Sequence, residues 1–314
     1  MAGNGNIDFF CLECYTDKSE VNTLQTEVIK IDRENMDLDA LKRAGEILKS
    51  GGLVAFPTET VYGLGGDGLH EESSRKIYEA KGRPSDNPLI VHVADMEHLE
   101  KIVKKVPKAA YKLAEAFWPG PMTMILEKND LVPYGTTGGL DTVAIRMPSD
   151  PIALELIRQG GGYIAAPSAN TSGRPSPTTA QHVYEDLQGK IPMILDGGAV
   201  TIGLESTIVD LTEEIPTILR PGFISLDMVQ AVLGEAQIDR GLIANDSNIH
   251  PKAPGMKYRH YAPKADLKIV EGPMEQVISY INEQAEKGRT GIICTEETRS
   301  RYPKGDIKCV GTRK

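Results

Sequence analysis

The sequence predicts an α/β protein: a large domain with a twisted mixed sheet and an open cationic cleft, then a linker and a small Rossmann-like βαβ unit. Three observations lead to this fold class. Between residues 25 and 245, short apolar runs alternate with amphipathic helical segments. Several runs are joined by short turns, which favours a mixed sheet over a uniform series of parallel βαβ units. From residue 246 the apolar pattern stops, and it resumes at 265.

Helices are predicted where apolar residues recur with a helical period. In the first of them, Asp39 is the expected N-cap, and Gly51 with Gly52 ends the helix. The predicted helices cover residues 39–49, 73–80, 95–105, 109–117, 151–158 and 179–187.

Strands are predicted where short apolar runs end in Gly, Pro or polar residues. These segments are LVAF, LIVHVA, MTMILEK, TVAIRMP, GYIAAPSAN, PMILDGG, ESTIVDLT and PTILRPG. The phosphate-binding pattern GxxxxGK[ST] is missing from the sequence, and the predicted elements do not form a clean series of Rossmann-type βαβ units. Nucleotide binding of either familiar type is therefore not expected.

Composition excludes several classes of protein. Of 314 residues, 40% are hydrophobic and 25% are charged, which is typical of a soluble globular protein. No run approaches the roughly 18 apolar residues of a membrane span, and the N-terminus does not resemble a signal peptide, so a cytoplasmic protein without membrane contact is expected. The net charge of −9 argues against stable nucleic-acid binding.

The region after residue 245 is predicted to hold a linker at 246–264 and a C-terminal unit at 265–314. The linker contains KAPGMKYRHYAPK, which is rich in basic and aromatic residues for a passive spacer. The segments DLKIVEG, PMEQVISYINEQAEKG and TGIICTE then predict strand, helix and strand, the start of a parallel βαβ unit.

Four cysteines give little sign of a metal site. Cys11 and Cys14 form a CxxC pair, but Cys294 and Cys309 are not tightly spaced and no set of histidines accompanies them. We expect reduced thiols and no metal held by protein side chains.

Four cations are the strongest candidates for chemistry. Lys81 and Arg83 lie in the rigid turn KGRP, while Arg146 and Arg220 end two predicted strands. Each one alone fits a solvated basic turn or a surface arginine equally well. Because ligands of α/β proteins bind at strand ends, the four together predict a pocket for a polyanion.

Small polar residues follow or open other predicted strands. PSANTSG can present backbone N–H groups and hydroxyls to phosphate, or it can be an ordinary turn. Thr60 could hold a small polar substrate, while Glu59 could be a base or only a structural acceptor. Ser206 offers a further hydroxyl, and His92 within an apolar strand is as typical of a hydrogen-bonded core residue as of a ligand contact.

Taken together, these segments resemble the YrdC-like domain family of threonylcarbamoyl-AMP synthases. The motifs that match, in the family's order, are FPTETVYGLG, KGRPSDNPLIVHV, FWPGPMT, VAIRMP, APSANTSGRPSPT, DGG, ESTIVD and LRPG, which span roughly 200 residues. The linker is similar to that of the long, two-domain form, although the C-terminal unit is shorter than in that form. The CxxC is not part of the family pattern.

The resemblance implies condensation of L-threonine, bicarbonate and ATP, with Mg²⁺ carried on the nucleotide phosphates, to threonylcarbamoyl-AMP and pyrophosphate. A partner complex then modifies adenosine in tRNAs that read ANN codons. It implies charge stabilisation by Lys81 and Arg83, without an acid or base. Threonine would be bound by Thr60, His92, Arg146 and Ser206. ATP would be bound by Lys81, Arg83, Asn87, Thr142, Ala166, Ser168, Asn170, Ser176, Arg220 and a linker tyrosine, Tyr258 or Tyr261.

Two other functions remain open at this point. One is a non-enzymatic RNA-binding module on the same fold, which the acidic net charge disfavours. The other is a carbamoyl-transfer enzyme of the hydrogenase-maturation type. That class is expected to carry zinc-finger and acylphosphatase-like segments upstream, for which the first 25 residues leave no room.

Overall fold

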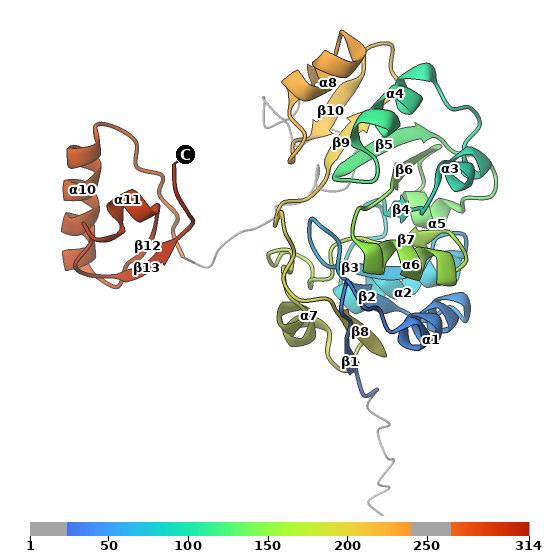
Figure 1. Ribbon diagram of the computed structural model, residues 1–314, viewed down its shortest axis with the longest axis horizontal. Coiled ribbons are helices and arrows are strands. Elements are labelled where there is room, and N and C mark those ends of the chain that lie inside the picture. Colours follow the sequence, from blue (N-terminus) through green and yellow to red (C-terminus); the bar gives the residue numbers. More distant parts are fainter. Residues whose placement is uncertain (1–23, 240–264, 314) are drawn as a thin grey trace, which may run out of the picture. The chain divides into compact units, whose positions relative to one another are not determined.

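The computed structural model describes residues 24–239 and 265–313 (Figure 1). The chain divides between residues 262 and 263 into two compact units, which are described separately below. This division lies within the predicted linker at 246–264, all of which is outside the described residues. In the described parts, none of the helices is long and apolar enough to cross a membrane.

The first unit is built on one eleven-stranded sheet with the order β1-β8-β2-β3-β7-β4-β6-β5-β9-β10-β11. Parallel and antiparallel pairs are mixed, for example β4 with β6 and β5 with β6, as the sequence predicts. The strands are β1 (Glu27–Lys30), β2 (Val54–Phe56), β3 (Gly63–Asp67), β4 (Ile90–His92), β5 (Met122–Glu127), β6 (Thr142–Arg146), β7 (Ile164–Ala165), β8 (Met193–Asp196), β9 (Thr207–Asp210), β10 (Thr217–Arg220) and β11 (Gln237–Ile238).

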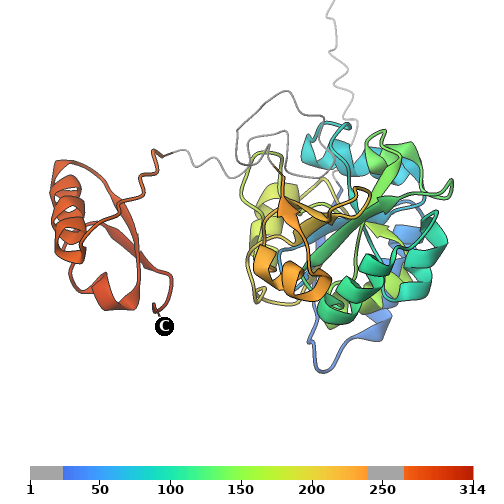
Figure 2. The same ribbon diagram turned by 90° about the horizontal axis from the view of Figure 1, so that it is seen from above.

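Helices surround the sheet, as the view from above shows (Figure 2). The predicted cap of the first helix was wrong, because Asp37 rather than Asp39 accepts a hydrogen bond from the N–H of Ala40. The helices are α1 (Leu38–Lys49), α2 (Glu71–Lys81), α3 (Met96–Ile102), α4 (Lys108–Phe117), α5 (Tyr134–Thr137), α6 (Pro151–Gln159), α7 (Ala180–Leu187) and α8 (Leu226–Leu233).

Strand β2 is buried on both faces because its residues alternate between two cores. Val54 and Phe56 pack with residues of α1 and α6 on one face. Leu53, just before the strand, and Ala55 pack with residues of α2 and α7 on the other. Both faces of the strand therefore need apolar side chains, so its sequence is a continuous apolar run rather than an alternation of apolar and polar residues.

The central strands have two unequal faces. Val143 and Ile145 of β6 face a large core with residues of α3, α4 and α8. The intervening Ala144 belongs to a small cluster with Ile90, Ile125, Ile208 and Leu219. Among the described residues, all members of this small cluster come from strands, and Ile90 also lines the pocket described below.

Strand β3 was not predicted because its sequence, GLGGD, reads as a turn. Its glycines are needed for packing rather than for a turn. A Cβ atom on Gly65 would lie 2.8 Å from Cγ2 of Ile164 and 3.0 Å from Cε1 of Phe56. A larger residue would therefore force the neighbouring strands apart.

The second unit contains α10 (Met274–Lys287), β12 (Gly291–Cys294), α11 (Glu296–Arg299) and β13 (Asp306–Cys309). β12 and β13 are parallel, with α11 between them in the sequence, but the predicted unit of strand, helix and strand is not formed. The prediction of a strand in DLKIVEG was wrong. Leu267 and Ile269 are 69% and 83% exposed, and no neighbouring strand pairs with this described segment.

Candidate active site

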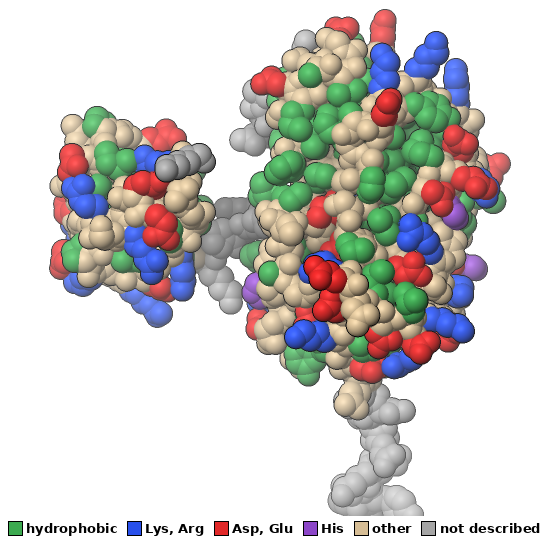
Figure 3. All heavy atoms as spheres, viewed as in Figure 1, with side chains coloured by type: hydrophobic (Ala, Val, Ile, Leu, Met, Phe, Trp, Pro, Cys, Tyr) green, Lys and Arg blue, Asp and Glu red, His purple; other side chains and the backbone are tan. Residues whose placement is uncertain are grey.

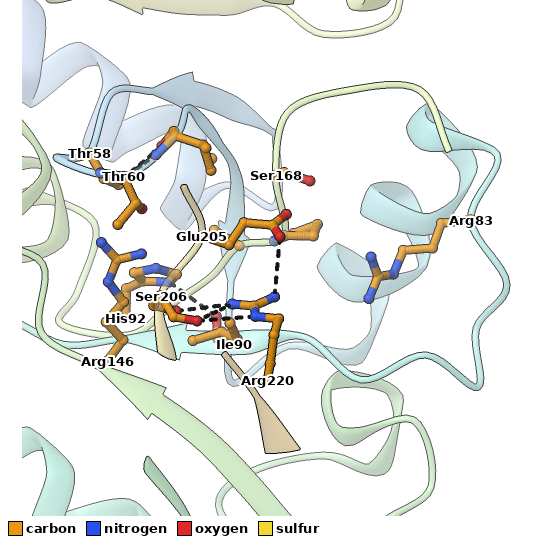
Figure 4. A pocket seen from close by; sticks show the side chains of 14 residues that line it. Thr58, Thr60, Arg83, Ile90, His92, Arg146, Ser168, Glu205, Ser206 and Arg220 are labelled. Carbon is orange, nitrogen blue, oxygen red and sulfur yellow. Dashed lines mark hydrogen bonds and ion pairs between the residues drawn. The ribbon is translucent and has the colours of Figure 1, made fainter. Parts of the chain in front are cut away.

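A pocket lies on the face of the central strands that carries the small cluster around Ile90 and Ala144 (Figure 4). Its walls come from the segment between β2 and β3, from the turn after α2, from β4, from the last residues of β6 and β10, and from the segments that follow β7 and precede β9. The described residues that line it are Thr58, Thr60, Val61, Gly63, Arg83, Ile90, His92, Arg146, Ala166, Pro167, Ser168, Glu205, Ser206 and Arg220.

The four residues predicted to bind threonine all line this pocket. His92 and Arg146 are register partners on the parallel strands β4 and β6, so their side chains are adjacent. Thr60 comes from the segment after β2, and Ser206 directly precedes β9. All four are at most 4% exposed. Figure 4 shows Thr60, His92 and Arg146 at the same end of the pocket.

Arg146 is held by a buried ion pair with Glu59. Nη2 of Arg146 donates to Oε1 of Glu59 at 2.6 Å, and the N–H of Ser149 donates to Oε2 at 3.1 Å. The Arg146 and Glu59 side chains are only 5% and 9% exposed. Because both carboxylate oxygens are engaged, Glu59 orients the guanidinium and is poorly placed to act as a base. This contact supports the structural-acceptor alternative for Glu59.

His92 is a neutral side chain in this pocket. Nδ1 donates its proton to the carbonyl oxygen of Ile90 at 3.1 Å, because a carbonyl can only accept. Burial, together with the positive charge of Arg146, lowers the pKa of His92 to about 3. Nε2 therefore carries a lone pair at neutral pH and can accept a hydrogen bond from an amine or a hydroxyl group.

Ser206 links the two ends of the pocket. Its hydroxyl lies 2.7 Å from the hydroxyl of Thr123. Arg220 donates from Nη2 to both the carbonyl oxygen and the hydroxyl of Ser206, each at 3.0 Å. The turn is close-packed, since a Cβ atom on Gly222 would lie 2.5 Å from the carbonyl oxygen of Glu205. The backbone around Ser206 therefore requires glycine at position 222.

Four of the residues predicted to bind ATP also line the pocket, namely Arg83, Ala166, Ser168 and Arg220. The Arg83 guanidinium donates to the carbonyl oxygens of Pro88, at 3.0 Å, and of Asn87, at 3.3 Å. Arg83 and Arg220 are partly exposed, so their charge can reach a ligand in the pocket.

The remaining predicted ATP residues lie behind or beside the lining. Buried Asn87 has an Oδ1 atom without a partner among the described residues. Asn170 is 5% exposed, and its Oδ1 accepts from the hydroxyl of Ser168. Ser176 donates to Oε1 of Glu205 at 2.8 Å. Thr142 begins β6, at the opposite end of the strand from Arg146.

Lys81 occupies an unexpected position. It is the last residue of α2, is 2% exposed, and donates from Nζ to the carbonyl oxygens of Ser168 and Asn170. Burial, with Arg83 nearby, holds the pKa of Lys81 well below its usual range. In this structure Lys81 fixes the 168–170 turn from behind, and its predicted contact with phosphate stays a prediction.

Sequence reasoning did not identify the lining residues Thr58, Val61 and Ile90, nor the carboxylate of Glu205. The Thr58 hydroxyl lies 2.9 Å from that of Thr60 and donates to the carbonyl of Val61. The position of Thr58 two residues before Thr60 is the sequence feature that could have identified it. Tyr258, Tyr261, Cys11 and Cys14 lie outside the described residues.

Two family models match the chain. The Sua5/YciO/YrdC model, which is described as "Telomere recombination", matches residues 46–222. The model described as "Threonylcarbamoyl-AMP synthase, C-terminal domain" matches residues 224–313.

Individual relatives agree with these models. A threonylcarbamoyl-AMP synthase from Pyrococcus abyssi is 52% identical over 80% of this chain and 74% of that protein. One from Bacillus subtilis is 50% identical over 87% of this chain and 79% of that protein. The crystal structure of P. abyssi Sua5 with L-threonine has a TM-score of 0.85 at 47% identity, with 91% and 84% of the two chains covered. The chain therefore belongs to the Sua5/YciO/YrdC family and carries the C-terminal domain of the threonylcarbamoyl-AMP synthases.

Proposed function

We propose that this chain is a threonylcarbamoyl-AMP synthase, which condenses L-threonine, bicarbonate and ATP to threonylcarbamoyl-AMP, pyrophosphate and water. The reaction is a nucleotidyl transfer from ATP to a carbamate. One observation carries the proposal. Arg146, His92 and Thr60 meet at one end of a pocket that also contains Arg83 and Arg220. Support comes from the relatives that bear this name and from the related structure that contains L-threonine.

The amino-acid side of the pocket consists of Thr60, His92, Arg146 and Ser206. The guanidinium of Arg146 suits the threonine carboxylate, because a carboxylate accepts two parallel hydrogen bonds from arginine. Neutral His92 can accept a hydrogen bond from the amine or the hydroxyl of threonine through Nε2. A neutral imidazole beside a fixed guanidinium also favours the uncharged amine, which is the form that can become a carbamate.

The nucleotide side of the pocket consists of Arg83, Ala166, Ser168 and Arg220. A carbamate oxygen attacks the α-phosphorus of ATP, and pyrophosphate leaves from the opposite side. Both groups are anionic, so the guanidiniums of Arg83 and Arg220 stabilise the charge that accumulates on the phosphate oxygens. The turn at Ser168, supported by Lys81, would present its hydroxyl and backbone to the phosphates.

Mg²⁺ neutralises charge on the nucleotide when it is bound. Among the described residues, no group of three or more His, Cys, Asp and Glu side chains could hold a metal ion. An Mg²⁺ ion that arrives with ATP takes most of its ligands from phosphates and water. We further propose a cytoplasmic enzyme whose product is consumed by a tRNA threonylcarbamoyl transferase complex.

No observation favours the RNA-binding alternative. On the face drawn in Figure 3, basic and acidic side chains are interspersed over the described residues of each unit. A protein that binds nucleic acid without catalysis needs a basic surface to neutralise phosphates. The relatives above bear the name of an enzyme.

The function is tested by pyrophosphate release from the full chain with MgATP and bicarbonate. Release is expected with L-threonine and not without it, and mass spectrometry should detect threonylcarbamoyl-AMP. L-serine and L-valine, which lack the methyl and the hydroxyl group respectively, are the matched controls. Pyrophosphate release that is the same with and without threonine would contradict the proposal.

A further inference from the structure

The pocket contains a carboxylate that the proposed reaction has not used. The lining described above includes three arginines and one acidic residue, Glu205. A carboxylate beside the phosphates of ATP repels them unless a cation lies between the two. We propose that Glu205 binds the Mg²⁺ ion that is carried by the nucleotide, directly or through one of its water ligands. This inference rests on the proposed function.

The structure holds the Glu205 side chain in place from several directions. Its Oε1 accepts a hydrogen bond from the hydroxyl of Ser176 at 2.8 Å. Its Oε2 lies 4.0 Å from Nη1 of Arg220, beyond hydrogen-bond distance but close enough for attraction. The backbone carbonyl of Glu205 is packed against Gly222, where a Cβ atom would lie 2.5 Å away. The carboxylate is therefore anchored at the edge of the nucleotide side.

Glu205 also lies where two cavities meet. It lines the pocket described above and a neighbouring hollow formed with Pro175, Ser176, Gly203, Leu204, Pro221 and Gly222. Its side chain is 20% exposed, unlike the buried residues of the amino-acid side. Figure 4 shows the carboxylate within the pocket beside the end of the Arg220 side chain. It can thus approach a ligand that Arg220 also contacts.

The chemistry of the carboxylate fits magnesium. Mg²⁺ prefers oxygen ligands, keeps several waters, and is bound in enzymes by one or two carboxylates together with substrate phosphates. A single glutamate near phosphate-binding arginines matches this pattern. A carboxylate could instead accept hydrogen bonds from the ribose hydroxyls. Binding of Mg²⁺ by Glu205 requires the metal ion, whereas hydrogen bonds from the ribose hydroxyls to Glu205 do not.

The test compares the affinity of the full chain for MgATP and for metal-free ATP in EDTA, measured by isothermal titration calorimetry. Glu205→Gln removes the charge and keeps the size of the side chain. We expect it to weaken MgATP binding by roughly tenfold to a hundredfold, the usual effect of losing a supporting ligand of a metal ion. Metal-free ATP should bind equally well or more tightly, because the repulsion has gone.

Two controls complete the experiment. Glu97→Gln removes a carboxylate that is 73% exposed on α3 and should change neither affinity. Glu205→Asp keeps the charge and should retain most of the preference for MgATP. Electron paramagnetic resonance of Mn²⁺–ATP gives a readout independent of affinity, since Glu205→Gln should alter the spectrum of the bound complex and Glu97→Gln should not.

The outcomes separate the two proposals. Equal losses for MgATP and metal-free ATP in Glu205→Gln would overturn the metal role in favour of a hydroxyl acceptor. Unchanged affinity for both forms would overturn any role of Glu205 in nucleotide binding. A wild-type chain that binds neither form would overturn the proposed function, and this inference with it.

Discussion

The two sides of the pocket differ in how completely the protein holds their side chains. On the amino-acid side, Thr60, His92, Arg146 and Ser206 are 0–4% exposed, and Arg146 is fixed by Glu59. On the nucleotide side, Arg83, Ser168 and Arg220 are partly exposed, and the Arg220 side chain is 18% exposed. Under the proposed function, the comparison teaches that the residues assigned to the amino acid belong to the protein core, whereas the arginines assigned to the nucleotide still face solvent.

The largest effect is expected from Arg146→Ala. It should raise the Kd for threonine by at least about a hundredfold, since a charged double hydrogen bond is lost, and leave the Kd for ATP nearly unchanged. It should also lower the free energy of unfolding by about 3–5 kcal/mol, because Glu59 becomes an unpaired buried charge. Calorimetry and urea denaturation measure the two quantities.

A double variant separates stability from binding. Arg146→Ala with Glu59→Gln removes both charges and should recover most of the lost stability while threonine affinity stays low. Equal losses of threonine and ATP affinity in the single variant would show that the two sides are not distinct.

A pH effect is expected from His92. Its pKa of about 3 in the folded protein is below the value of 6.5 for an ordinary histidine. Between these values the unfolded chain binds a proton that the folded chain does not, so stability is lost as pH falls from about 6.5 towards 3. The loss at the acid end is on the order of 4 kcal/mol.

The measurement is urea denaturation of the wild type and of His92→Gln across this pH range. The variant should lack the part of the slope that His92 contributes, whereas His182→Gln, which changes an exposed side chain of α7, should keep it. Parallel pH profiles for the wild type and His92→Gln would refute the assignment of a neutral buried imidazole.

The smallest effect on stability is expected on the nucleotide side. Arg83→Ala should weaken ATP binding roughly tenfold through loss of a charged contact, yet cost about 1 kcal/mol or less in unfolding free energy. Arg75→Ala is the matched control, since Arg75 pairs on the surface with Glu72 and Glu79 and should affect neither quantity strongly. A large loss of unfolding free energy in Arg83→Ala would contradict the expected difference in stability effects between the amino-acid side and the nucleotide side of the pocket.

Much of this arrangement could be predicted from local sequence. Arg146 and Arg220 end apolar runs, and ligands bind where such strands end, so their meeting in one pocket follows from the mixed sheet. The partnership of Arg146 with Glu59 could not be predicted this way, because 87 residues separate them. Lys81 was predicted to lie in the turn KGRP, whereas α2 continues through it and its side chain is buried. β3 was missed because glycine is read as a turn signal.

The close approach of Gly222 to Glu205 and Ser206 has a consequence for engineering. The antiparallel strands β9 and β10 meet at this corner, where even one methyl group has no space. A library designed to make the pocket accept a different amino acid can vary Val61, whose side chain lines the wall, but should keep Thr58, whose hydroxyl contacts Thr60 and the Val61 carbonyl. Position 222 should be left unmutated, because any replacement there would move the Ser206 backbone, which Arg220 also contacts, and so disturb both of the proposed sides of the pocket in one step.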